Sequence, residues 1–278
     1  MGGIIWLASY PKSGNTWVRA FIQNFFVNAY EPVDINDLGR FFAWEADRRF
    51  YRSLLRQANL SEDDERAVAS VREQAHVQIS KISPESIFVK THNCMGDSYG
   101  YPLHNMDVTV GAIYILRNPL DVAISMTSHY GMSQDEAITH LGNPAAMTGT
   151  KVQVFQRHAD WSTHVSSWTQ SPNPYLHVVR YEDMKEDPKK YFGRMAKFLG
   201  LKFSPERLRR AIKNSSFEKL KKQEQEKGFK EKSESAELFF RKGETDQWRE
   251  VLSDAQIKKI ISDHREVMEK FGYVPEGY

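Results

Sequence analysis

Apolar residues along the chain form short continuous runs that alternate with longer helical stripes. The first run is apolar at nearly every position, a pattern typical of a parallel strand buried on both faces, and three further candidate strands follow it. These predicted strands cover Ile4–Ser9, Ser86–Lys90, Val110–Leu116 and Tyr175–Val179. Stripes with apolar residues three and four positions apart lie between the runs and predict helices. Strands that alternate with helices predict an α/β fold in which helices flank a parallel sheet.

Capping residues and prolines mark where most of the helices should begin. The expected starts are Thr16, Ser61 with Asp64, Asn118-Pro119, Asp187-Pro188, Ser204-Pro205, and Ser253 with Gln256. The last of these helices should be closed by Gly272. The stretch from about 30 to 83 is expected to be helical and less regular than the rest.

One domain over residues 1–278 is the simplest organisation, because the chain has no internal repeats and no Pro- or Ser-rich linker. The stretch from Glu218 to Glu237 is rich in Lys and Glu and poor in apolar residues. It is expected to be solvated and mobile. A second interpretation remains open, in which residues of about 218–240 form a lid, since they lead directly into a basic motif.

The charge balance and the composition argue against several kinds of function and site, beginning with nucleic-acid binding. The 38 Lys and Arg residues nearly balance the 36 Asp and Glu residues, so nucleic-acid binding is not expected and anionic ligands must be held by local clusters. The single cysteine, Cys94, excludes a disulfide within the chain and is expected to be a small buried or loop residue. The nine histidines lack the spacing of a metal site, so no metal is expected.

The apolar run that includes Trp6 is too short for a signal peptide, and no run approaches the length of a membrane span. These features predict a cytoplasmic protein without a membrane span.

The loop Tyr10-Pro11-Lys12-Ser13-Gly14-Asn15 joins the first predicted strand to the first helix. Unpaired N–H groups at a helix start attract anions, and glycine allows close approach of the backbone. Lys12 adds a charge, and Ser13 and Thr16 add hydroxyl donors. The loop therefore predicts a phosphate-binding site, although Asn15 stands where a Walker loop would have lysine. An ordinary turn with an exposed lysine is the alternative.

Four polar residues follow four different predicted strands, namely Lys12, His92, Arg117 and Tyr181. In a parallel sheet these positions share the carboxyl edge, where ligands bind. We therefore expect them to lie close together.

Five segments, in the same order along the chain, resemble those of the PAPS-dependent sulfotransferases, which use 3′-phosphoadenosine 5′-phosphosulfate as donor. The resemblance is closest to bacterial small-molecule members. The segments are Tyr10-Pro11-Lys12-Ser13-Gly14-Asn15-Thr16-Trp17, Val89-Lys90-Thr91-His92, Arg117 to Ser125, Arg180-Tyr181-Glu182-Asp183-Met184, and Phe240-Arg241-Lys242-Gly243. The resemblance implies a P-loop-like α/β fold and transfer of a sulfuryl group from PAPS, with PAP as product, to a hydroxyl or amine of a small acceptor.

The resemblance also implies roles for individual residues. His92 would be the general base, Lys12 would stabilise the leaving phosphate, and Lys90 would assist. The 5′-phosphosulfate would lie in the loop Lys12, Ser13, Gly14, Asn15 and Thr16. The 3′-phosphate would be held by Arg117, Ser125, Arg241, Lys242 and Gly243, and the adenine would lie near Trp17, Tyr181, Ser216 and Phe217.

Three departures from the family pattern are visible. Asn15 replaces a common threonine, and an amide can still donate a hydrogen bond. Asp246-Gln247-Trp248-Arg249 stands where the family usually has Gly-Asp-Trp-Lys. The dimerisation segment of many animal members is not found, so the sequence indicates no oligomeric state.

Alternatives remain for the function and for individual residues. A P-loop kinase would use ATP with Mg²⁺, and a non-catalytic module would bind PAP without transfer. Trp17 could instead pack in the core, His92 could be satisfied by the backbone, Arg117 could pair with Asp121, and Arg241-Lys242 could be an exposed basic pair. The aromatic residues Phe41, Phe42, Trp44, Tyr99, Tyr101, His129 and Tyr130 favour a hydrophobic or aromatic acceptor and core packing equally. Phenol, alcohol and amine acceptors all remain open.

Overall fold

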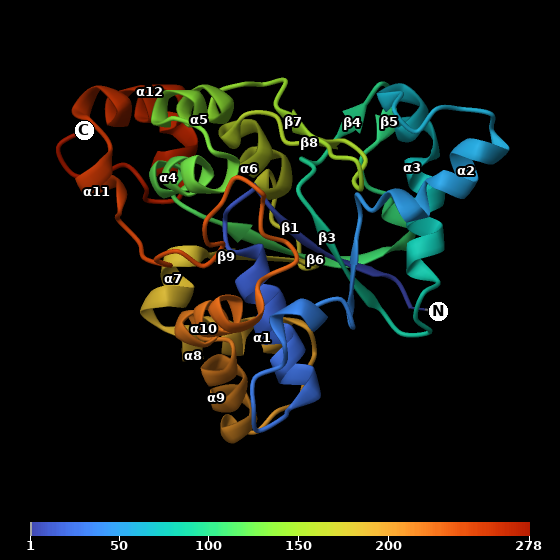
Figure 1. The fold of residues 1–278 in the computed structure, drawn as a ribbon, viewed down its shortest axis with the longest axis horizontal. Helices are drawn as coiled ribbons and strands as arrows, with labels where there is room; N and C mark the ends of the chain where they lie inside the picture. The colour runs from blue at the N-terminus through green and yellow to red at the C-terminus, as the bar shows by residue number, and fades with distance from the viewer. Residues whose placement is uncertain (1) are drawn as a thin grey trace. The chain divides into compact units, whose positions relative to one another are not determined.

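The computed structural model describes residues 2–278 and has the predicted α/β class. Its main sheet has the order β2-β3-β1-β6-β9 (Figure 1). The strands are β1 (Ile4–Ser9), β2 (Phe42–Trp44), β3 (Ile87–Thr91), β6 (Thr109–Leu116) and β9 (Leu176–Arg180). β3 runs parallel to both β1 and β2, with Ile4 opposite Ile87 and Phe42 opposite Phe88. The four predicted strands are thus present within one residue of their expected bounds.

β2 was not predicted. It lies in the stretch that the pattern indicated to be helical, and that expectation was wrong at residues 42–44. Three residues are too few to show a strand period, so the pairing with β3 decides the structure there.

Contacts group the chain into two compact units, each assembled from three separate segments. The first unit contains the stretch up to Tyr10 together with 42–114 and 143–178, and the second contains 11–41, 115–142 and 179–278. The prediction of one domain over 1–278 stays a prediction.

The first unit carries most of the main sheet. Its other elements are α2 (Arg52–Gln57), α3 (Glu65–Ser80), α6 (Trp161–Thr169), and two short hairpins, β4 (Asp97–Ser98) with β5 (Tyr101–Pro102) and β7 (Met147–Thr148) with β8 (Gln156–Arg157). Asp64 caps α3 by accepting hydrogen bonds from the N–H groups of Arg66 and Ala67. Ser61 accepts one from Asp63, ahead of the helix.

The second unit consists mainly of helices. They are α1 (Asn15–Val27), α4 (Pro119–Tyr130), α5 (Gln134–Leu141), α7 (Tyr181–Glu186), α8 (Pro188–Phe198), α9 (Pro205–Asn214), α10 (Phe217–Lys227), α11 (Trp248–Val251) and α12 (Asp254–Lys270). α4, α5 and α12 pack together, and α1 packs on α9 (Figure 1). The caps expected at Asn118, Asp187, Ser204 and Ser253 all accept hydrogen bonds from their helices.

The Lys- and Glu-rich stretch contains a helix and packs within the second unit, which its composition did not indicate. Residues Phe217–Lys227 form α10, and Leu220 packs in a buried cluster with Ala20, Ile35, Leu38, Phe229 and Phe240. The apolar residues are few but share one face. Whether residues 218–240 act as a lid stays a prediction.

Within residues 2–278, no helix is long and apolar enough to cross a membrane. The same part of the chain contains no group of three or more His, Cys, Asp or Glu side chains that could hold a metal ion.

Candidate active site

The loop after β1 has an uncommon backbone conformation. Lys12 and Gly14 both have positive φ, at 67° and 103°. Glycine adopts this region without penalty, whereas a lysine there is sparsely observed and is often associated with function. A Cβ on Gly14 would lie 2.7 Å from Cδ2 of Tyr181, so a side chain at this position would collide with that ring.

Residues that follow three strands meet in the second unit, as expected from the strand order. Arg117, which follows β6, donates a hydrogen bond from Nη1 to the carbonyl of Lys12 at 3.1 Å. Its guanidinium carbon also lies 4.4 Å from the ring centroid of Tyr181, which follows β9. The hydroxyl of Tyr181 in turn donates to the carbonyl of Gly243 at 3.1 Å. Arg117 and Tyr181 therefore link the loop after β1 to the basic C-terminal motif.

Three polar atoms in this group are buried and have no hydrogen-bond partner among residues 2–278. They are Ser13 Oγ, Trp17 Nε1 and Arg117 Nε. Buried polar atoms normally have partners, and each of these can donate. A cluster of such donors beside a lysine suits an anionic ligand with several acceptor oxygens.

Trp17 and Phe217 both pack against the buried cluster that contains Leu220 and Phe240. Trp17 makes edge contacts with Tyr181 at 5.5 Å and Phe192 at 5.2 Å. Trp17 therefore packs against neighbouring rings, and its contact with adenine stays a prediction. A Cβ on Gly243 would lie 2.2 Å from the ring of Phe217, so the basic motif passes directly over that ring.

The remaining residues predicted to bind PAPS differ in their exposure and local contacts. Ser125 is half-buried on α4, and Ser216 caps α10 through the N–H of Lys219. Arg241 and Lys242 have exposed side chains. The ammonium of Lys12 lies 4.1 Å from the ring centroid of Phe239.

His92 lies in the first unit at the end of β3. Its Nδ1 is 2.8 Å from the carbonyl of Ser9, which can only accept, so in the neutral ring Nδ1 carries the proton and Nε2 the lone pair. Burial and the charge of Lys90 lower the pKa of His92 well below its ordinary value. The ring is therefore neutral at neutral pH, as a general base requires.

The main chain of His92 is held by two side chains that the sequence did not indicate, and a third side chain supports one of them. Its N–H donates to Gln156 Oε1 at 3.1 Å, and its carbonyl lies 3.1 Å from Nε2 of His164. His164 is fully buried, and burial lowers its pKa to about 3, so Nε2–H of a neutral ring is the donor. The hydroxyl of Tyr114 lies 2.8 Å from Nδ1 of His164, so a series of hydrogen bonds connects Tyr114 through His164 to His92.

A buried polar cluster supports the residue that follows His92. Asn93 donates to Glu45 Oε2 at 2.9 Å, and Glu45 also accepts from Tyr51 and Arg72. These side chains have almost no exposed surface. The lowering effect of Arg72 and His76 outweighs burial and brings the pKa of Glu45 to about 2, so the carboxylate is charged.

The residues proposed for the acceptor side have mixed surroundings. The ammonium of Lys90 lies 4.6 Å from the ring of Trp44, and Phe42 is buried against Phe88. Tyr99 is half-exposed and donates to Glu65. Packing explains Phe42, whereas Trp44 and Tyr99 keep exposed surface. The lining of an acceptor site stays a prediction.

Cys94 is buried beside Leu103 and Ala159, as expected of a small core residue.

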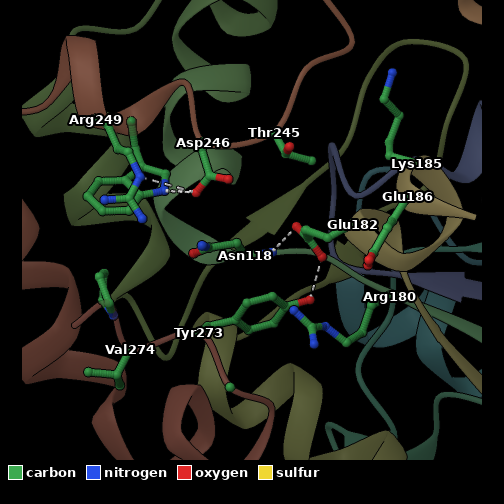
Figure 2. Close-up of a pocket in the computed structure, with 13 residues that line it drawn as sticks. Asn118, Arg180, Glu182, Lys185, Glu186, Thr245, Asp246, Arg249, Tyr273 and Val274 are labelled. Carbon is green, nitrogen blue, oxygen red and sulfur yellow. Dashed lines mark hydrogen bonds and ion pairs between the residues drawn. The ribbon is translucent and has the colours of Figure 1, made fainter.

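A cavity of about 590 Å³ opens in the second unit (Figure 2). It is lined by Asn118, Arg180, Glu182, Lys185, Glu186, Thr245, Asp246, Trp248, Arg249, Gly272, Tyr273, Val274 and Pro275. Glu182 accepts hydrogen bonds from the N–H of Asn118 at 3.0 Å and the hydroxyl of Tyr273 at 2.7 Å. None of the residues predicted to bind PAPS lines this cavity, although Asn118 and Glu182 directly follow Arg117 and Tyr181 in the sequence.

Comparison with known proteins identifies relatives along nearly the whole chain. Residues 4–272 match the sulfotransferase domain family. A flavonol 3-sulfotransferase of Flaveria bidentis is 28% identical over 275 residues, which covers 92% of this chain and 78% of the relative. Cytosolic sulfotransferase 13 of Arabidopsis thaliana is 27% identical over 278 residues, with 94% and 75% covered.

Solved structures show the same fold. A retinol dehydratase in complex with androsterone and the inactive cofactor PAP superposes with a TM-score of 0.65 at 19% identity, covering 96% of this chain and 80% of that chain. A mouse sulfotransferase complexed with PAP superposes with a TM-score of 0.62 at 18% identity, covering 98% and 88%.

Proposed function

This chain belongs to the sulfotransferase family, and we propose that it transfers the sulfuryl group of PAPS to a hydroxyl or amine of a small acceptor. The observation that carries the proposal is the contact between the phosphate loop and the basic C-terminal motif through Arg117 and Tyr181. A bisphosphorylated adenosine has an anionic group at each end and an aromatic base. This arrangement supplies cations, an aromatic ring and unpartnered donors for such a molecule.

His92 is proposed as the general base. Its Nε2 would take the proton of the acceptor as the acceptor oxygen or nitrogen forms a bond to sulfur and the bond from sulfur to the 5′-phosphate oxygen breaks. The hydrogen bond to Ser9 supports this role because it leaves the Nε2 lone pair available.

Lys12 is proposed to neutralise the charge that develops on the departing 5′-phosphate, with Lys90 assisting. Its place in the loop after β1 and the buried Ser13 Oγ beside it support this role. Arg117, Ser125, Arg241, Lys242 and Gly243 would hold the 3′-phosphate, which serves as an anchor distant from the reacting sulfur.

The acceptor is proposed to be a small hydrophobic or aromatic molecule. Its class is supported by the names of two relatives, one a flavonol sulfotransferase and one a structure that contains androsterone. The cytoplasm is the proposed location, in line with relatives named as cytosolic enzymes.

Calorimetry with PAP, followed by a screen of phenols, alcohols and amines with labelled PAPS, tests the proposal. PAP should bind at modest ionic strength, and transfer should proceed in EDTA. Turnover of ATP that requires Mg²⁺ would instead identify a kinase, and binding of PAP without transfer to any acceptor would identify a binding module.

A further inference from the structure

The basic motif lies in an irregular segment that is tied down at both ends by buried carboxylates. We define residues 239–248 as the strap. At one end, the two oxygens of Glu224 accept hydrogen bonds from the N–H groups of Phe239 at 2.7 Å and Phe240 at 2.8 Å. At the other end, the two oxygens of Asp121 accept from Asp246 at 2.8 Å and Trp248 at 3.3 Å.

Both carboxylates are almost inaccessible, with 4% of Glu224 and 1% of Asp121 exposed. Burying a carboxylate is costly unless its oxygens are hydrogen-bonded. An irregular segment, for its part, has backbone N–H groups that no sheet or helix satisfies. One carboxylate that accepts from two N–H groups solves both problems, and it also fixes the orientation of two peptide planes.

Between these anchors, the strap contacts Tyr181 and Arg117, two residues predicted to bind PAPS. The carbonyl of Gly243 accepts from the Tyr181 hydroxyl, and the carbonyl of Glu244 accepts from Arg117 Nη2 at 3.2 Å. Asp121 also lies four residues before Ser125 on α4, so both occupy the same face of that helix. One end of the strap is therefore anchored one helical turn from a residue expected to contact the 3′-phosphate.

We propose that Asp121 and Glu224 are positioning residues that hold the strap in the conformation that binds the 3′-phosphate of the donor. The inference rests on the proposed function, since it deepens the assignment of the donor site. Neither carboxylate would touch the nucleotide. They act through the strap, and their effect should be confined to ligands that carry a 3′-phosphate.

The test compares PAP with 5′-AMP, which lacks the 3′-phosphate, by calorimetry on the full chain. Asp121→Asn and Glu224→Gln each keep the side-chain shape but replace one acceptor oxygen with an amide group that cannot accept. Each variant should bind PAP about tenfold more weakly, the effect of about one charge-assisted hydrogen bond, and should bind 5′-AMP as the wild type does. Asp254→Asn and Glu226→Gln, which change exposed carboxylates in α12 and α10, are matched controls and should change neither affinity.

Equal losses for PAP and 5′-AMP would assign the two carboxylates to general stability and overturn the inference, as would unchanged PAP binding. If one variant does not fold, the other is judged alone, by the ratio of its affinity for PAP to its affinity for 5′-AMP. A wild-type protein that fails to prefer PAP over 5′-AMP would instead refute the proposed donor, and the inference with it.

Discussion

At the residue scale, the hydrogen bond from His92 to Ser9 decides the protonation of the proposed base. Burial and Lys90 lower the pKa of His92 below its ordinary value of 6.5, so the neutral form persists as the pH falls through 6.5. A group with a lowered pKa loses its basic form only below that ordinary value.

The first prediction follows from this state. His92→Ala should lower kcat by about 10²–10⁴-fold because it removes the base, while the affinity for PAP should hardly change. In the wild type, kcat/KM should stay level between pH 8 and 6.5 and should fall only below that range. Full activity of the variant, or a fall in the wild type centred near pH 7.5, would exclude His92 as the base.

The second prediction concerns the phosphate loop. Gly14→Ala should weaken PAP binding by about tenfold, because alanine is strained at φ 103° and its Cβ would meet the Tyr181 ring. Gly39→Ala is a suitable control in the same unit, since a Cβ there meets nothing within 4 Å. Equal PAP affinities for the two variants, measured by calorimetry, would show that the loop does not contact the donor.

At the scale of elements, capping explains why most helix starts could be predicted from the sequence. A capping side chain acts on an N–H two or three residues ahead, so its signal is local. Asp64 shows this at α3, and Ser61 shows the limit of the method, because it was grouped with Asp64 yet its hydroxyl accepts from Asp63. β2 could not be foreseen because its structure depends on β3, a distant part of the chain.

The third prediction distinguishes these two capping candidates. Asp64→Ala should lower the free energy of unfolding by about 1 kcal/mol, since it removes the hydrogen bonds to Arg66 and Ala67. Ser61→Ala should lower it by less, because Ser61 lies outside the helix. Urea unfolding of both variants gives the comparison, and an equal loss would mean that the first turn of α3 is stabilised differently.

The residues of the proposed PAPS site also differ in whether a local sequence pattern could indicate them. Lys12, Arg117 and Tyr181 could be brought together from the sequence because each lies within three residues of the end of a strand of one parallel sheet. Asp121 and Glu224 could not. Their N–H donors are supplied by residues 15 to 127 positions away, so no local pattern indicates these hydrogen bonds.

At the scale of the whole molecule, charge is buried in the first unit where composition gave no sign of it. Glu45 and Arg72 are both fully buried and paired, with Tyr51 and Asn93 as further partners of the carboxylate. Removing one member of such a pair leaves an uncompensated charge in the core. A substitution that removes only one member of the pair is therefore expected to destabilise the fold.

The fourth prediction is a dependence of stability on this pair and on pH. Glu45→Gln should lower the free energy of unfolding by about 3 kcal/mol at pH 7, because Arg72 remains buried without a counter-charge. The lowered pKa means that the wild type has its full advantage above the ordinary value of 4.5 and loses it as the pH falls towards 2. Denaturant unfolding of both proteins across this range should show the difference shrinking.

Glu269→Gln, which breaks an exposed pair with Arg265, is the control and should cost less than about 1 kcal/mol. A difference between wild type and Glu45→Gln that stays constant from pH 7 to pH 3 would contradict the ionised state of Glu45.

The alternation of the chain between its two units limits how the protein can be taken apart. The backbone passes from one unit to the other after Tyr10, Phe41, Tyr114, Gly142 and Val178. No continuous fragment therefore contains one complete unit without segments of the other. The first unit is complete only after residue 178 has been synthesised, and the second only after residue 278. Truncation is thus a poor route to a minimal donor-binding fragment, and we expect shortened versions of this protein to aggregate instead of retaining partial affinity for nucleotide.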